Sequence, residues 1–197
     1  MPAPLAPMLT LRLATPDDAA ACAAIYAPAV TDSATSFELV PPDAAEMAAR
    51  IADVLPRYPW IVAEEDGRVV GYVYASAHRT RAAYAWAVET SVYLAEEAQG
   101  RGLGRTLYTV LFAVLRAQGY VGAYAGVTVP NDASLGLHRA FGFETIGVFP
   151  HLGFKGGRWH DVWWGALALR PLDGTPEPPV TLAELGADRL AALLAVR

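Results

Sequence analysis

The sequence predicts one α+β domain, in which a β-sheet is covered by helices, and three observations lead to this fold class. The chain has 197 residues, a length that a single hydrophobic core can serve. It is 54% hydrophobic and only 18% charged, unlike disordered chains. Strand-like and helix-like patterns follow one another along it without an internal repeat. We therefore expect one folded domain.

In the first half of the chain, alternating apolar residues predict strands, and prolines followed by acids predict helix starts. Asp66-Gly67 is a typical tight-turn pair, so the strands that flank it are predicted to be antiparallel neighbours. The predicted elements are strands at 9–13, 60–64 and 69–74, a helix that opens at Pro16 and runs to Tyr26, and a second that opens at Pro41-Pro42-Asp43 and runs toward Leu55.

In the second half, a strand is predicted to lead through a glycine-rich loop into an amphipathic helix. The predicted elements are strands at 86–94, 121–129, 143–148 and 159–169, and helices at 102–117 and from the Asn131-Asp132 cap to Ala140, which Gly142 ends. The predicted organisation is a flexible arm (1–8), the domain (9–170), a Pro-rich linker (171–180) and an appended C-terminal helix (181–197) that opens on a capping box.

Composition excludes several classes of function. Lys and Arg number 15 against 20 Asp and Glu, giving a net charge of −5, and no basic cluster could follow a nucleic-acid backbone. No apolar stretch reaches the roughly 20 residues of a membrane helix, and the start of the chain does not resemble a secretory signal. A single cysteine, Cys22, lies among alanines and cannot form an internal disulfide. We therefore expect a cytoplasmic protein with no nucleic-acid or membrane partner.

The glycine-rich loop predicts an anion site, because backbone N–H groups can converge at the start of the helix that follows. Pyrophosphate suits such a loop when arginines flank the glycines. A nucleotide P-loop does not fit, because no Gly-Lys-Ser/Thr follows, and a dinucleotide fingerprint would need an earlier position and a glycine where Arg105 stands. The residues expected to bind the ligand are Gln99, Gly100, Arg101, Gly102, Leu103, Gly104 and Arg105.

This loop resembles the acetyl-CoA signature of the GNAT superfamily of N-acetyltransferases. Four further motifs resemble the phosphinothricin N-acetyltransferase family within it: Glu89-Thr90-Ser91-Val92-Tyr93, Pro130-Asn131-Asp132, Leu137-His138 and the run from Gly153 to Val162. The resemblance spans about residues 9–169. It implies a GNAT-like α+β fold, with a mixed, mostly antiparallel central sheet, a splayed acetyl-CoA-binding strand and flanking helices. It also implies a homodimer that needs no metal and acetylates the amine of phosphinothricin, methionine sulfoximine or a similar amino acid.

Acetyl transfer to an amine needs a proton acceptor, a stabilised oxyanion and a proton for the leaving thiolate. Glu89 is the expected base, since it stands among apolar residues of a central strand that would make it a better proton acceptor. His138 follows Asn131 at the spacing where the superfamily often has a thiolate-protonating tyrosine. Its imidazole would donate to the sulfur or share the base role, and both alternatives stay open.

The other expected contacts divide between the two substrates. Backbone N–H groups of Val92, Tyr93 or Leu94 would meet the oxyanion and the pantetheine arm, and Asn131 would cap its helix or contact that arm. The expected acceptor residues are Arg79, Arg81 and Tyr84 before the Glu89 strand, Phe37 as an apolar wall, and Tyr108, for which a core position is an equal alternative.

The sequence departs from the family's usual pattern at Arg139, which follows His138, and at Gly156, and these changes bear on the substrate. The sequence leaves two alternative functions. A non-catalytic acyl-CoA-binding module would have no need of both Glu89 and His138. An acetyltransferase for polyamine or peptide amines would need an acidic acceptor site, which Arg79 and Arg81 disfavour.

Overall fold

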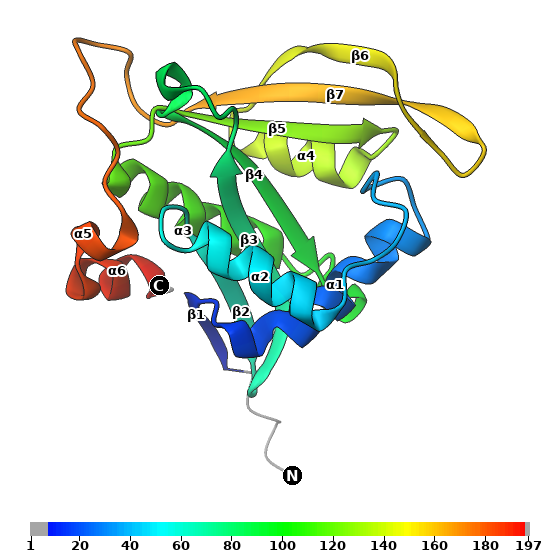
Figure 1. Ribbon diagram of the computed structural model, residues 1–197, viewed down its shortest axis with the longest axis horizontal. Helices are drawn as coiled ribbons and strands as arrows, with labels where there is room; N and C mark the ends of the chain where they lie inside the picture. Colours follow the sequence, from blue (N-terminus) through cyan, green and yellow to red (C-terminus); the bar gives the residue numbers. More distant parts are fainter. Residues whose placement is uncertain (1–7, 196–197) are drawn as a thin grey trace.

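The computed structural model describes residues 8–195, which form a seven-stranded sheet with helices on both faces (Figure 1). The strand order is β1-β2-β3-β4-β5-β7-β6, and β4 and β5 are parallel while the other neighbours are antiparallel. Apart from Met8, the predicted N-terminal arm lies outside the described residues. The mixed, mostly antiparallel sheet agrees with the prediction.

The elements follow the predicted order. The strands are β1 (Leu9–Leu13), β2 (Trp60–Glu65), β3 (Arg68–Ala77), β4 (Ala87–Leu94), β5 (Gly122–Val129), β6 (Glu144–Lys155) and β7 (Arg158–Ala168). The α-helices are α1 (Ala19–Thr31), α2 (Ala44–Val54), α3 (Leu103–Gln118), α4 (Asp132–Ala140), α5 (Leu182–Leu185) and α6 (Ala187–Leu194), and short 3-10 turns are η1 (Pro16–Asp18), η2 (Ala82–Tyr84) and η3 (Glu96–Ala98). Within residues 8–195, no helix has both the length and the apolar composition to cross a bilayer.

Each face of the sheet has its own hydrophobic core. α3 turns Leu107, Leu111 and Leu115 toward one face, at the four-residue spacing that places side chains on one side of a helix. α1 and α2 cover the other face (Figure 1), where Cys22 is fully buried. β4 is the middle strand of this seven-stranded sheet, so the strand that carries Glu89 is central, as the sequence predicted.

Two predicted elements differ in extent. α1 continues to Thr31 although Pro28 lies inside it, because the proline loses one backbone hydrogen bond while the next residues still bury Val30 in the core. β6 continues past the predicted end to Lys155 and pairs with β7 across irregularities in register. The Asp66-Gly67 hairpin is confirmed: both residues have positive φ, 49° and 80°, as this turn requires.

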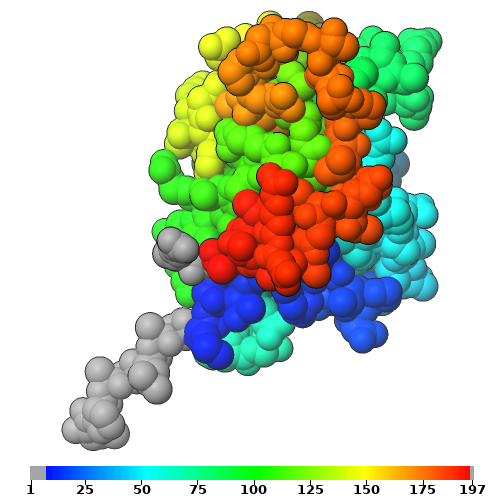
Figure 2. Space-filling model, turned by 90° about the vertical axis from the view of Figure 1, so that its left-hand side faces the viewer, coloured from blue at the N-terminus to red at the C-terminus, as the bar shows by residue number. Residues whose placement is uncertain are grey.

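The C-terminal segment also differs from the prediction. The single helix expected over 181–197 is two short helices, because Gly186 interrupts them with a φ of 88°. Leu182 and Leu185 are buried in the same core as α3, and Figure 2 shows this segment in red against the body of the protein. The linker is held as well, since the carbonyl of Glu177 accepts a 2.8 Å hydrogen bond from the indole of Trp86. The segment is thus packed against the domain, and residues 196–197 lie outside the described part of the chain.

Candidate active site

The parallel strands β4 and β5 separate halfway along their length. Their pairing ends at Glu89 and Tyr124, although β4 continues to Leu94 and β5 to Val129. β4 remains paired with β3 as far as Leu94, so its open edge is the one toward β5. Buried backbone N–H and C=O groups need partners. An extended ligand chain can supply them as an added strand would.

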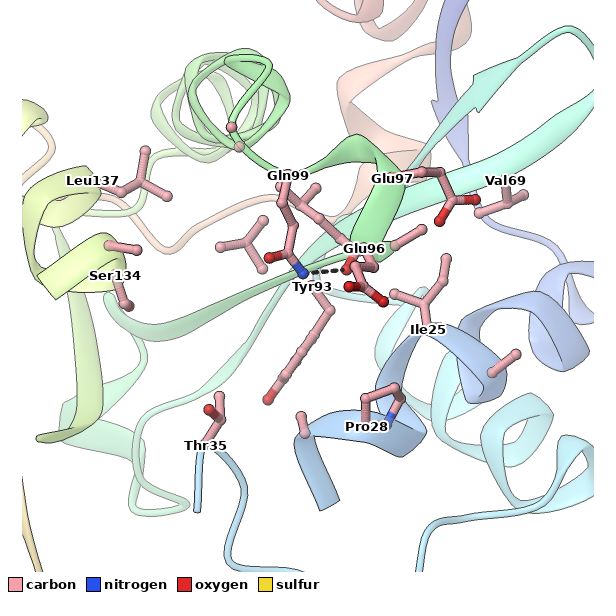
Figure 3. A pocket seen from close by; sticks show the side chains of 18 of the residues that line it. Ile25, Pro28, Thr35, Val69, Tyr93, Glu96, Glu97, Gln99, Ser134 and Leu137 are labelled. Carbon is pink, nitrogen blue, oxygen red and sulfur yellow. Dashed lines mark hydrogen bonds between the residues drawn. The ribbon is translucent and has the colours of Figure 1, made fainter. Parts of the chain in front are cut away.

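A groove of about 1440 Å³ runs along this open edge (Figure 3). Ser134 and Leu137 of α4 lie on one side of it, and Ile25 and Pro28 of α1 lie on the other, with Tyr93 between them. The groove brings together most of the residues that the sequence predicted for the cofactor: Val92, Tyr93, Leu94, Gln99, Gly100, Gly102, Gly104, Arg105 and Asn131.

The glycine loop has the conformation of an anion site. Gly100 and Gly102 have φ angles of 70° and 84°, which favour glycine, and Gly102 is the N-cap of the 16-residue helix α3. The N–H groups of the first turn therefore open into the groove at the positive end of a long helix. Gly104 serves another purpose: a Cβ there would lie 3.3 Å from Cδ2 of Leu137, so the glycine allows α3 and α4 to approach closely.

Two loop residues lie differently from the prediction. The guanidinium of Arg101 forms a 2.7 Å ion pair with Glu65 and does not line the groove, so its bond to the ligand stays a prediction that requires this ion pair to open. Leu103 is 5% exposed and packs in the core, which leaves only its backbone for a ligand. Arg105 does line the groove, with its guanidinium 5.9 Å from the centre of the Phe141 ring.

Glu89 lies where the two strands separate, and its surroundings are polar. Oε1 lies 2.9 Å from Nδ1 of His78 and 3.3 Å from Nη1 of Arg79. The apolar surroundings predicted for this carboxylate are therefore wrong, because His78 and Arg79 follow β3, the strand that pairs with β4. Arg79 also donates to the carbonyl of His78 over 2.7 Å, so its predicted role at the acceptor becomes, in the first place, a contact with Glu89.

The remaining predicted acceptor residues lie on two segments. Arg81 caps the turn η2, and Tyr84 in that turn is half exposed, with its ring edge toward His78 at 6.4 Å between centroids. Phe37 lies in the loop between α1 and α2 and packs on Gly153, where any Cβ would overlap the phenyl ring. Lys155 holds this loop by donating a 2.6 Å hydrogen bond to the carbonyl of Ser36. No hydrogen bond or ion pair within residues 8–195 joins Arg81 to Glu89.

His138 and Tyr108 are buried behind the groove. His138 is 3% exposed, its Nδ1 donates a 2.7 Å hydrogen bond to the carbonyl of Ser134, and its Nε2 accepts one of 3.0 Å from the Tyr108 hydroxyl. Burial lowers the pKa of His138 and raises that of Tyr108, so both are neutral near pH 7. Neither side chain lines the groove. His138 therefore does not reach the thiolate's side of the groove as expected, and for Tyr108 the core position, the equal alternative, is the one observed.

A profile of the acetyltransferase (GNAT) domain matches residues 11–164. The chain belongs to the GNAT acetyltransferase family. It is 46% identical over 166 residues to phosphinothricin N-acetyltransferase of Alcaligenes faecalis, with 83% of each chain covered. It is 37% identical over 156 residues to the L-methionine sulfoximine/L-methionine sulfone acetyltransferase of Pseudomonas aeruginosa, covering 78% of this chain and 90% of the relative. A GNAT phosphinothricin acetyltransferase structure from Sinorhizobium meliloti, in complex with acetyl-CoA, matches with a TM-score of 0.82 and 38% identity over 86% of this chain and 93% of that one.

For this GNAT protein, the predicted fold, family and N-acetyltransferase class are confirmed. Sequence reasoning missed His78 as a partner of Glu89. The signal lay in the register of β3 against β4. Ser76 pairs with Glu89, so His78, two residues after Ser76, is the diagonal neighbour of Glu89 on the same face of the sheet. Reading that register from the sequence would have required the exact start of β4.

We expect Gly102→Glu to abolish acetyl-CoA binding. A side chain at a φ of 84° strains the loop, and the added carboxylate would repel pyrophosphate at the N-terminus of α3. Titration calorimetry measures the affinity, and circular dichroism checks the fold. Gly174→Glu is the matched control, since Gly174 also has a positive φ, 66°, but lies in the linker. Equal affinities for the two folded variants would show that the glycine loop does not hold the phosphates.

Proposed function

We propose that this GNAT enzyme transfers the acetyl group of acetyl-CoA to the amine of a small anionic amino acid of the phosphinothricin or methionine sulfoximine type. One observation carries the proposal: the open edge of β4 begins at Glu89, so the cofactor groove and a carboxylate belong to the same strand. Arg81 precedes that strand and suits an anionic acceptor, while its neighbour Arg79 contacts Glu89. The substrates named for the related enzymes support the same class.

Acetyl-CoA would bind along the groove in an extended form. Its pantetheine arm would pair with the open edge of β4 at Val92–Leu94, and its pyrophosphate would lie on the glycine loop beside Arg105. Asn131 caps α4 by accepting a 3.1 Å hydrogen bond from the backbone N–H of Ser134, and its side chain at the groove would contact the arm as well.

The reaction needs a neutral amine at the thioester. Glu89 would take a proton from the acceptor ammonium, directly or through one water, and the freed lone pair would attack the thioester carbonyl carbon. The carbonyl oxygen becomes an oxyanion, which backbone N–H groups of Val92–Leu94 would stabilise. The C–S bond then breaks, the attacking nitrogen gives up its second proton, the thiolate of CoA takes up that proton directly or through water, and the acetylated amine leaves.

His138 would support the departing thiolate without donating to it. Its two ring nitrogens are already engaged, Nδ1 by the Ser134 carbonyl and Nε2 by the Tyr108 hydroxyl. The thiolate would therefore take the proton that the attacking nitrogen gives up, directly or through water in the groove. In this proposal the buried Tyr108–His138 hydrogen bond joins α3 to α4 and keeps the wall behind the groove in place.

Acceptor binding would use the residues around the outer side of Glu89. Arg81 would hold the carboxylate or the phosphinate with its two-pronged guanidinium, and Tyr84 would add a hydroxyl. Phe37, fixed against Gly153, would close the apolar side. These contacts would place the amine next to Glu89 and so reduce the entropic cost of bringing two substrates together.

We expect Glu89→Gln to lower kcat/KM by roughly 10²-fold or more, the usual scale for loss of a general base, while acetyl-CoA affinity stays nearly unchanged. The deficit should shrink at high pH, where solution supplies more neutral amine. A pH series of initial rates, followed by release of the CoA thiol, measures both effects. Glu177→Gln in the linker is the control. A deficit that stays constant over the pH range would indicate a structural role for Glu89.

We expect Arg81→Ala to raise KM for the amino-acid acceptor far more than for acetyl-CoA, since only the acceptor loses a charge-assisted contact. Arg81→Lys should restore it only in part, because an ammonium cannot replace a bidentate guanidinium. Arg189→Ala on α6 is the control, an exposed arginine in the C-terminal segment.

The acceptor itself supplies the complementary test. Rates should be compared for phosphinothricin, methionine sulfoximine, methionine sulfone, their analogues without a carboxylate, polyamines and peptides. Removing the carboxylate should slow the wild type strongly and Arg81→Ala little, a non-additivity that indicates direct contact. If amines without any acid group react equally well, the enzyme acts on polyamine or peptide amines instead.

We further propose that the enzyme is a homodimer, formed through the edge strand β6. This strand ends the sheet and carries large apolar side chains that are about half exposed, an arrangement that favours pairing with another chain. They are Ile146, Val148, Phe149, Leu152 and Phe154, with Trp159 of β7 beside them.

We expect Phe149→Lys to convert the protein from dimer to monomer, because a charge would be buried in the apolar contact. Size-exclusion chromatography with light scattering measures the mass. Leu172→Lys is the control, since Leu172 is 85% exposed but lies in the linker. A monomeric wild type would contradict the proposal.

A further inference from the structure

The two carboxylate oxygens of Glu89 have different surroundings. Oε1 accepts hydrogen bonds from two basic side chains, at 2.9 Å from Nδ1 of His78 and 3.3 Å from Nη1 of Arg79. No hydrogen bond to Oε2 occurs within the part of the chain that the structure describes. A carboxylate held through one oxygen is restricted in rotation and presents the other. Oε2 is therefore the oxygen available to an acceptor amine.

His78 is the more firmly held of the two donors. Its ring stacks on Tyr124 of β5, with 4.5 Å between centroids and an angle of 17°, and meets the Trp164 ring edge-on at 5.9 Å. Its side chain is 15% exposed, against 55% for Arg79. The stacked ring has little freedom to turn away from Glu89. Since an ionised carboxylate only accepts hydrogen bonds, Nδ1 carries the proton in this contact.

We propose that His78 is a positioning residue for acetyl transfer: it holds Oε1 of Glu89 through Nδ1–H and thereby directs Oε2 toward the acceptor amine. The inference rests on the proposed role of Glu89 as the base. It also assigns a purpose to the stack with Tyr124, which fixes the donor at the last paired residue of β5 facing β4. Arg79 restrains Oε1 less firmly than His78 does, because its contact is longer, at 3.3 Å against 2.9 Å, and its side chain is more exposed.

Two variants separate the hydrogen bond from the packing. His78→Phe keeps a ring for the stack and removes the donor. His78→Asn loses the ring but places an amide N–H near the position of Nδ1. We expect His78→Phe to lower kcat about 10-fold, the scale of one hydrogen bond to a charged group, with KM for acetyl-CoA unchanged. His78→Asn should recover most of that loss.

The same variants are then combined with Glu89→Gln. If His78 acts through Glu89, His78→Phe should cause no further loss once Glu89 is Gln, so the two effects are not additive. Thermal unfolding and acetyl-CoA calorimetry confirm that each variant is folded and binds its cofactor. Additive losses, or a folded His78→Phe with wild-type kcat, would overturn the inference. If Glu89→Gln alone is fully active, the proposed base itself fails, and that outcome is distinct from both.

Discussion

The site depends on one constraint, that β4 is paired along its whole length on one edge and only as far as Glu89 on the other. β5 cannot close the gap, because it is paired with β7 from Gly122 to Val129 and leads directly into α4. The unpaired backbone groups face the groove, where a ligand with an extended polar arm would supply hydrogen-bond partners. The gap between two otherwise well-paired strands therefore becomes a binding groove.

The alternation of side chains along a strand gives β4 three separate tasks. Its open edge faces the cofactor groove, Val92 and Leu94 pack toward the core beneath α3, and Tyr93 packs among the aromatic residues beneath α1. Glu89 points to the same face as Tyr93, since the two are an even number of residues apart. One rigid strand thus relates the thioester site to the proposed base, which favours the aligned geometry that acyl transfer requires.

Charges at this site are arranged mostly in pairs. Of the four arginines predicted to bind a substrate, Arg79 contacts Glu89 and Arg101 contacts Glu65, which leaves Arg81 and Arg105 for the two substrates in our proposal. The environment of Glu89 is set by donors from the end of β3 and not by exclusion of water. Such a carboxylate is oriented by hydrogen bonds, which is the property that proton transfer from a bound amine needs.

The sequence by itself determined the elements, the family and the glycine loop, because these follow from local signals: periodicity, capping residues and a short motif with positive-φ glycines. It also placed Glu89 on the central strand that opens there, since Glu89 begins the separate motif 89–93. Tertiary structure decided which side chains meet. Contacts between Glu89 and His78, Arg101 and Glu65, or His138 and Tyr108 join segments 11 to 36 residues apart. Such contacts depend on strand register and helix packing, where a shift of one residue reverses the face, and no local pattern specifies that shift.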